Sequence, residues 1–320
     1  MKPYLTLLFL LVAIHGFAQR QNIYLLTNDG KYVHARDSAD FIRIVREPDS
    51  ASTLYNVMEF YMNGKLKTKG KSKQINPPEF EGQCMTYYPN GQRKAISLFS
   101  DGLRSGPEFL FYPNGKPYLV REYHNDKEIE GDLRGYVIQS CFDSLGTVLA
   151  ENGNGYVKIH DDNFTGVIEE GELKNGHRDG TWKGYDGRIE ASFGETYANG
   201  ELIAGTATFA DGSLSSYSKA RLTAPYFAGG KEAYYEYLNN NIIYPAYENT
   251  HDIGGTAVIS FTVEKDGTVS DVEVEKSVTQ RLDNEAIRVI KKSTHWKPGT
   301  AFGKPIRVKY HVPVSFIPQI

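Results

Sequence analysis

A short turn motif returns at a fixed spacing along this chain of 320 residues. Tyr88-Pro89-Asn90-Gly91 recurs 24 residues later as Tyr112-Pro113-Asn114-Gly115, and Asn175-Gly176 recurs as Asn199-Gly200 at the same offset. Asn-Gly tolerates the positive φ angles of a two-residue hairpin turn, and the aromatic and β-branched residues around it favour strands. Because one hairpin cannot bury its own face, neighbouring copies must stack into an extended sheet or solenoid.

Weaker copies extend the pattern, at Tyr61-Met62-Asn63-Gly64 and at Phe142-Asp143-Ser144-Leu145-Gly146. A content of 31 Gly, 22 Tyr and 16 Phe agrees with strands joined by tight turns. The clearest unit is Gly176-His177-Arg178-Asp179-Gly180-Thr181-Trp182. With these motifs, the segment 55–212 resembles the MORN-like repeats of exported bacterial proteins, and the resemblance implies a scaffold or interaction surface. The plainer interpretation is that the hairpins only build the sheet.

The first eighteen residues have the pattern of an export signal. Lys2 precedes an apolar run from Tyr4 to Ile14, and Gly16-Phe17-Ala18 offers a cleavage site with small residues. The run is shorter than the roughly 20 residues that cross a bilayer. We therefore expect a signal peptide at 1–18 and an exported protein. The alternative is an uncleaved leader that anchors the chain to the inner membrane.

Charge and cysteine content restrict the partners and the covalent bonds. The chain has 36 Lys and Arg against 39 Asp and Glu, and a net charge of −3 does not favour nucleic acid as a partner. The two cysteines, Cys84 and Cys141, lie 57 residues apart. In an oxidising compartment they could form one disulfide, and two separately buried thiols fit the sequence equally well.

No pattern in the chain indicates an enzyme. The eight His residues are dispersed, and neither a His-Glu-x-x-His pair nor a Gly-x-Ser-x-Gly turn occurs. His160-Asp161-Asp162-Asn163 lacks the glycine and the distal Glu of a calcium loop, so we interpret it as a solvated turn. Trp182 and Trp296 are expected to anchor cores. We predict no catalytic residues, no metal or cofactor, and no small-molecule substrate.

The chain changes character after residue 225. Lys231 to Leu238 is predicted to be a helix, and Ala257 to Val263 alternates as a strand does. Asp266-Gly267 predicts a hairpin turn into a second strand, in which Val269, Val272 and Val274 break the alternation and indicate a bulge.

One helix and one strand complete the pattern. Leu282, Ala286, Val289 and Ile290 share one helix face, Trp296-Lys297-Pro298-Gly299 is expected to stop the helix, and Ile306 to Phe316 forms one apolar strand face. The predicted fold is mainly β with a C-terminal α+β domain, a small antiparallel sheet with helices on one face. The predicted divisions are a signal peptide at 1–18, an N-terminal segment at 19–54, repeats at 55–212, a linker at 213–225 and the C-terminal domain at 226–320.

Spaced motifs in the C-terminal segment carry a second resemblance. They are Tyr244-Pro245, Gly255, Phe261, Asp266-Gly267, Val272, Ala286, Trp296-Lys297-Pro298-Gly299 and the closing apolar strand. Over about 226–317 the chain resembles the TonB C-terminal domain family. The resemblance implies a periplasmic protein that binds the TonB box of outer-membrane receptors in energised transmembrane transport. Proton-driven motor proteins of the inner membrane are a second implied class of partner.

The resemblance also implies a binding site, in which the receptor peptide pairs with the last strand and contacts the region of Tyr244-Pro245. An unpaired sheet edge accepts an extended peptide as a further strand, and Pro313, which lacks an N–H, fits an edge strand. The candidate partner-binding residues are Tyr244, Pro245, Ile306, Arg307, Val308, Lys309, Tyr310, His311, Val312, Pro313 and Val314.

Charge around this strand has three interpretations. Residues 288–320 contain seven Lys and Arg and no acids, whereas residues 225–287 contain four basic and eleven acidic residues. A basic edge could steer an acidic peptide. Lysine on an edge strand could instead block aggregation, or the two charged halves could neutralise each other.

The chain departs from the family pattern in three places. An energy transducer of this family also has an N-terminal membrane helix and a long Pro-rich linker. Here the 14 Pro are scattered, and the repeats stand where that linker would be. Glu248 stands where a small apolar helix residue is expected. These departures leave a second function open: a cell-envelope scaffold whose repeats bind a partner without energy transduction.

Overall fold

The computed structural model describes residues 20–124 and 135–318. The predicted signal peptide at 1–18 lies outside these residues. Within the described part of the chain, no helix combines the length and the apolar character needed to cross a membrane. The chain divides into two compact units, Met1–Gly155 and Tyr156–Ile320.

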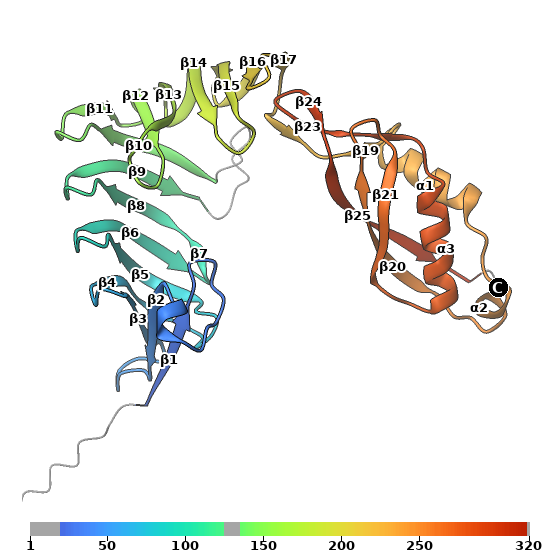
Figure 1. Ribbon diagram of the computed structural model, residues 1–320, viewed down its shortest axis with the longest axis horizontal. Coiled ribbons are helices and arrows are strands. Elements are labelled where there is room, and N and C mark those ends of the chain that lie inside the picture. Colours follow the sequence, from blue (N-terminus) through green and yellow to red (C-terminus); the bar gives the residue numbers. More distant parts are fainter. Residues whose placement is uncertain (1–19, 125–134, 319–320) are drawn as a thin grey trace, which may run out of the picture. The chain divides into compact units, whose positions relative to one another are not determined.

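The first unit is an antiparallel sheet of successive hairpins (Figure 1). Each strand from β1 to β6 pairs with the next one, and β8 to β11 continue the order beyond the short strand β7. A 3-10 helix, η1 (Arg36–Ser38), lies between the first two strands. The strands are β1 (Gln21–Leu26), β2 (Phe41–Arg46), β3 (Tyr55–Tyr61), β4 (Leu66–Ser72), β5 (Phe80–Tyr87), β6 (Arg93–Ser100), β7 (Leu103–Arg104), β8 (Gly106–Phe111), β9 (Pro117–Tyr123), β10 (Tyr136–Phe142) and β11 (Val148–Glu151).

The repeated turn residues join each hairpin to the next one. The Tyr88 hydroxyl donates to the carbonyl of Phe111 at 2.7 Å, and the Asn90 amide donates to the carbonyl of Pro113 at 2.8 Å. The same two bonds recur in the neighbouring copies, from Tyr61 and Asn63 and from Tyr112 and Asn114. The sequence repeat therefore corresponds to a repeated set of contacts between hairpins.

The turns themselves are of two kinds. Asn175-Gly176 and Asn199-Gly200 have positive φ at both residues, as predicted for two-residue hairpin turns. In Tyr88–Gly91 only Gly91 has a positive φ, and its N–H donates to the Tyr88 carbonyl at 2.8 Å. Pro89 thus begins the central pair of a type I turn, the position that proline favours. The two-residue prediction is wrong for this turn and for Tyr112–Gly115, which has the same bond.

Both cysteines of the first unit are buried and neither is in a disulfide. Burial raises the pKa of the Cys84 thiol to about 11, and the charge of Glu59 adds to the effect. The structure therefore favours two separately buried thiols over one disulfide.

The second unit begins with further hairpin strands. They are β12 (Asn154–His160), which crosses the unit boundary, β13 (Val167–Lys174), β14 (His177–Asp186), β15 (Ala191–Ala198), β16 (Glu201–Phe209) and β17 (Leu214–Tyr217). Trp182 on β14 is fully buried, as predicted, and its indole N–H donates to the Glu172 carbonyl at 2.8 Å. A Cβ at Gly171 would lie 2.4 Å from the Trp182 ring, so this strand position requires glycine.

The C-terminal part adds three helices and a small sheet (Figure 1). In that sheet β20 lies between β21 and β25, and both pairs are antiparallel. The helices are α1 (Gly230–Asn241), α2 (Ala246–Thr250) and α3 (Gln280–Lys291). The strands are β18 (Leu222–Thr223), β19 (Tyr226–Phe227), β20 (Gly255–Val263), β21 (Val269–Lys276), β22 (Trp296–Lys297), β23 (Gly299–Ala301), β24 (Lys304–Ile306) and β25 (Val308–Phe316). The fold class predicted from the sequence is confirmed.

The core of this domain joins the predicted helices to the sheet. Leu282, Val289 and Ile290 of α3 pack with Ile259 of β20 and Val314 of β25, all fully buried. The bulge predicted in the hairpin is present, because the register of β20 and β21 shifts twice. Thr279 caps α3, with its side chain accepting from the Leu282 N–H at 3.3 Å.

Three local predictions need correction or refinement. Helix α3 ends at Lys291, before the predicted stop, and Trp296–Lys297 forms β22, which pairs with β19. Ile306 belongs to β24 rather than to the last strand, which begins at Val308. Glu248, where a small apolar residue was expected, is only 3% exposed in α2 and accepts a hydrogen bond from the Thr279 hydroxyl at 3.3 Å.

Candidate functional site

Strand β25 is at the edge of its sheet. It pairs with β20 from Val308 to Phe316 without a register shift, and no other strand of residues 20–124 and 135–318 pairs with its opposite side. An edge strand presents a row of backbone N–H and C=O groups to solvent, where another chain can pair. The predicted binding strand therefore has one open side within the described structure.

Pro313 indicates which backbone groups of β25 point outward. It lies opposite Val258, and because proline has no N–H, this pair cannot be a hydrogen-bonded pair of the ladder. The two kinds of pair alternate along an antiparallel ladder, so Lys309, His311 and Ser315 share the outward orientation of Pro313. The Pro313 carbonyl accepts a hydrogen bond from the Tyr234 hydroxyl at 3.2 Å, as an outward carbonyl should.

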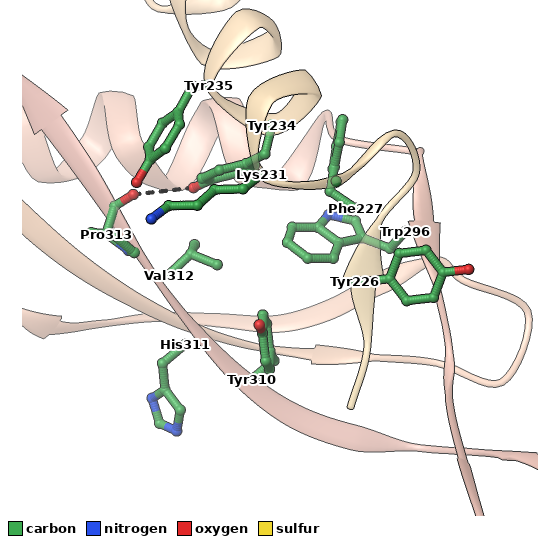
Figure 2. Close-up of a pocket in the computed structure, with 11 residues that line it drawn as sticks. Tyr226, Phe227, Lys231, Tyr234, Tyr235, Trp296, Tyr310, His311, Val312 and Pro313 are labelled. Atoms are coloured by element: carbon green, nitrogen blue, oxygen red, sulfur yellow. Dashed lines mark hydrogen bonds between the residues drawn. The ribbon is translucent and has the colours of Figure 1, made fainter. Parts of the chain in front are cut away.

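A pocket of about 430 Å³ lies between α1 and this outward edge (Figure 2). Strands β19 and β22 complete its walls, and His311, Val312 and Pro313 close the side formed by β25. The lining is mostly aromatic, with Tyr226, Phe227, Tyr234, Tyr235, Trp296 and Tyr310. We call this space the edge pocket.

The rings of the edge pocket support one another. The Trp296 ring meets Phe227 edge to face at 5.4 Å between centroids and Tyr310 in the same way at 5.9 Å. Such pairs are stabilising beyond the area that they bury. Burial raises the pKa of Tyr234, so its hydroxyl remains protonated at neutral pH and can donate to Pro313.

Tyr244 lies at a second pocket, of about 310 Å³, beside the end of β25. Its ring meets Phe316 edge to face at 5.8 Å, and its hydroxyl donates to the Ile253 carbonyl at 3.0 Å. Pro245 precedes α2 and does not line this pocket. Of the residues predicted to bind a partner, four line the edge pocket (Tyr310, His311, Val312 and Pro313) and Tyr244 lines the second pocket. The others line neither of these two pockets: Pro245, Ile306, Arg307, Val308, Lys309 and Val314.

Basic side chains of β25 and its approach are paired with acids of the same domain. Arg307 binds Glu264 at 2.8 Å, Lys309 lies 3.7 Å from Glu273, and the His311 ring is 2.7 Å from Glu275. Opposite charges of the two halves therefore meet across the exposed face of the sheet. Of the three interpretations of the charge pattern, mutual neutralisation has direct structural support.

The sequence did not indicate most of the edge pocket. Tyr226, Lys231 and Tyr235 come from β19 and α1, far from β25 along the chain, and no spacing in the sequence links them to the strand. Trp296 was expected only in a core. It is indeed buried, at 5% exposure, and it also forms one wall of the pocket. The sequence feature that could have pointed to the edge pocket is the group of aromatic residues between 226 and 237.

Comparison with known proteins concerns the C-terminal domain. Residues 240–318 match the family model described as Gram-negative bacterial TonB protein C-terminal. Two solution structures of the TonB C-terminal domain of Helicobacter pylori are similar to this chain. One is 26% identical over 27% of this chain and 78% of its own, with a TM-score of 0.22. The other is 28% identical over 27% of this chain and 89% of its own, with a TM-score of 0.23.

No curated protein matches the chain. The family match supports a TonB C-terminal domain at 240–318, as the sequence motifs predicted. A domain of this kind is a non-catalytic interaction domain of transport systems. The resemblance of the upstream hairpins to MORN-like repeats remains a prediction.

Proposed function

We propose that this protein is a periplasmic TonB-like protein that binds the TonB box of outer-membrane receptors by strand addition to β25, in the context of energised transmembrane transport. The observation that carries the proposal is the open side of β25, with the outward backbone groups of Lys309 and His311 next to the edge pocket. The family match at 240–318 points to the same class of partner.

The outward N–H of His311 provides a direct test. His311→Pro removes this N–H without breaking a bond to β20, whereas His311→Ala removes the same side chain and keeps the N–H. We expect His311→Pro to weaken binding of a synthetic TonB-box peptide about tenfold, from lost hydrogen bonds, and His311→Ala to bind nearly as the unmodified protein. Calorimetric titration of the chain from residue 20 measures both. Equal affinities of the two variants, or no binding by the unmodified protein, would contradict the proposal.

We also propose that the protein is exported and that it contacts motor proteins of the inner membrane. Residues 1–18 supply the signal peptide, and Edman sequencing of the protein from its host tests this, with a start near residue 19 expected. An intact leader would favour the anchored alternative. Contact with inner-membrane motor proteins rests on the family match alone.

One observation favours the second candidate function, a cell-envelope scaffold. Met85, Ile96, Phe109 and Val120 lie directly opposite one another on β5, β6, β8 and β9, and they form an apolar row on one face of the sheet. Phe109 is 40% exposed. Contiguous exposed apolar side chains mark interaction surfaces, so this row is a candidate docking face for a partner.

Crosslinking in the envelope fraction tests the scaffold function. Phe109→Ser should abolish a crosslinked partner that Leu145→Ser retains, because Leu145 is a 76% exposed residue of a turn outside the row. Identical crosslinks in the two variants would argue against the scaffold. Both substitutions lie in the first unit and β25 belongs to the second, so peptide binding in both variants should equal that of the unmodified protein.

A further inference from the structure

The two faces of β25 carry different side chains, apolar and aromatic on one face and charged on the other. A strand added to its edge would extend both faces. Tyr310 and Val312 lie on the side of the sheet that carries the edge pocket, whereas Lys309 and His311 lie on the exposed side next to the acids of β21. Successive side chains of a strand alternate between the two faces. Alternate residues of a bound strand would therefore point into the edge pocket.

We infer that the edge pocket takes one bulky apolar, preferably aromatic, side chain of the bound strand, and that this side chain sets the specificity of the site. The inference rests on the proposed strand addition and goes further by naming what the strand must carry. The bound partner is then an extended segment with a large apolar residue at one position that faces α1. The neighbouring positions of this segment can carry residues of many types.

The lining of the pocket supports this choice of side chain. Tyr226 and Tyr235 are 56% and 42% exposed at its walls, so two aromatic rings remain available to a guest. Among the described residues that line the pocket there is no Asp or Glu, and the Lys231 ammonium lies 5.7 Å from the Tyr235 ring centroid. A guest ring would meet exposed aromatic rings and a cation, both of which favour aromatic partners.

Charge on the exposed face does not supply the specificity. Lys309 and His311 already have carboxylates of β21 beside them, so an acidic guest residue there would compete with Glu273 and Glu275. The volume of the edge pocket, about 430 Å³, is in the range of sites that enclose a small ligand and is ample for one bulky side chain. Recognition by shape and apolar contact is therefore favoured over recognition by charge.

Pro313 limits the length of the paired segment. It has no N–H to offer, and its outward carbonyl is already bonded to the Tyr234 hydroxyl. The ladder of a guest strand is thus continuous along Lys309 and His311 and is interrupted at Pro313. The pocket lies beside this end of the ladder, so the bulky residue belongs at the end of the paired segment.

The experiment is a positional scan of a synthetic TonB-box peptide, with Trp, Ala or Asp placed at each position in turn and affinity measured by calorimetry on the chain from residue 20. At one position, the peptide with Trp should bind about tenfold more tightly than the peptide with Ala, because the Trp side chain buries apolar surface. At the two adjacent positions Trp should not raise the affinity, because those side chains point to the opposite face of the sheet. Asp at the favoured position should bind more weakly than Ala.

Variants of exposed tyrosines assign the effect to the pocket. Tyr226→Ala and Tyr235→Ala each remove one wall and should reduce the preference for Trp over Ala to threefold or less. Tyr247→Ala removes a tyrosine of α2 that is 52% exposed and outside the pocket, and it should leave the preference unchanged. These side chains are largely exposed, so the variants should fold.

The outcomes separate this inference from the proposed function. If every peptide binds with one affinity and His311→Pro weakens them all, strand addition holds and the specificity assigned to the pocket is wrong. A preference for Trp that survives both Tyr226→Ala and Tyr235→Ala would also overturn it. If no peptide of the scan binds, both the proposed function and the inference fail.

Discussion

The repeat strands and the C-terminal domain bury carboxylates on different kinds of element. Four carboxylates are buried on strands of the repeats, Glu59, Glu108, Glu169 and Glu195, none more than 7% exposed. The C-terminal domain also buries carboxylates, but Glu248, Asp283 and Glu285 lie on helices, and its core cluster consists of apolar side chains from Phe227 to Phe316. The repeat sheet thus carries buried, paired charges on its strands among many buried apolar residues, whereas the described strands β20, β21 and β25 bury no carboxylate.

Each buried carboxylate of the repeats has several partners. Glu108 accepts hydrogen bonds from Ser97 at 2.7 Å and Arg104 at 3.0 Å, and it lies 3.0 Å from Arg121. Glu195 accepts from Tyr217 and from Arg221, each at 2.7 Å. A buried charge is tolerated only when it is paired and hydrogen-bonded, and these sites meet that condition.

This difference shows that an array of hairpins combines apolar burial with specific polar contacts on its strands. Each repeat is short, and polar pairs fix its register against the neighbouring strands. The consequence is an unequal sensitivity to substitution, because removing one partner leaves an uncompensated buried charge, whereas removing methyl groups leaves a cavity.

The largest expected effect is in the repeats. Glu195→Ala leaves Arg221 without its main partner and should lower the free energy of unfolding by about 3–5 kcal/mol. The matched control is Glu170→Ala, which removes an ion pair with Lys183, a side chain 67% exposed, and should cost less than about 1 kcal/mol. Urea unfolding followed by tryptophan fluorescence measures both variants. Equal losses of unfolding free energy would show that the buried network of Glu195 stabilises the fold no more than an exposed ion pair does.

A second prediction uses pH. Burial alone would raise the pKa of Glu59, but Lys67, Thr68 and Arg43 together lower it below its ordinary value of 4.5. A lowered pKa means that the charged form stabilises the folded state above pH 4.5, and that this stabilisation is lost as the pH falls through the folded-state pKa. Glu59→Gln should therefore cost about 1.5–3 kcal/mol at neutral pH and progressively less in acid.

The apolar core provides the control for the pH prediction. Ile259→Val removes one methylene group from a fully buried site of β20 and should cost about 0.5–1.5 kcal/mol at either pH. Urea unfolding of both variants near neutral pH and near pH 3 gives the comparison. If Glu59→Gln lowers the free energy of unfolding by the same amount at both pH values, the charge of Glu59 does not stabilise the fold.

The C-terminal domain was predictable from sequence because its signals are local. Period-two strands, the Asp266-Gly267 turn and the apolar face of α3 each depend on neighbours within one element, and the structure confirms all three. The predicted end of α3 was wrong, since the helix already ends at Lys291. Trp296 instead pairs as part of a strand with β19, a contact that only tertiary structure supplies.

The buried charges and the edge pocket were not predictable, for a related physical reason. Nothing in the sequence distinguishes Glu195, which is 3% exposed, from other glutamates, because its partner Arg221 is 26 residues away. Tyr226 and Lys231 likewise reach β25 only through folding. The candidate strand itself could be predicted, since alternation and Pro313 are local features, whereas the side chains that give it a shaped pocket could not.

The smallest expected effect concerns the turns of the two regions. The Asn90 amide donates to the carbonyl of Pro113 in the next hairpin, whereas Asp266 accepts hydrogen bonds from Thr268 within its own turn. Asn90→Asp keeps the size and the oxygen that accepts from Gln92, but it loses the donor and places a carboxylate beside a carbonyl, so it should cost about 1 kcal/mol. Asp266→Asn keeps the accepting oxygen and should lower the melting temperature less. Thermal unfolding compares them, and a larger loss for Asp266→Asn would mean that contacts between hairpins do not set the stability of the repeats.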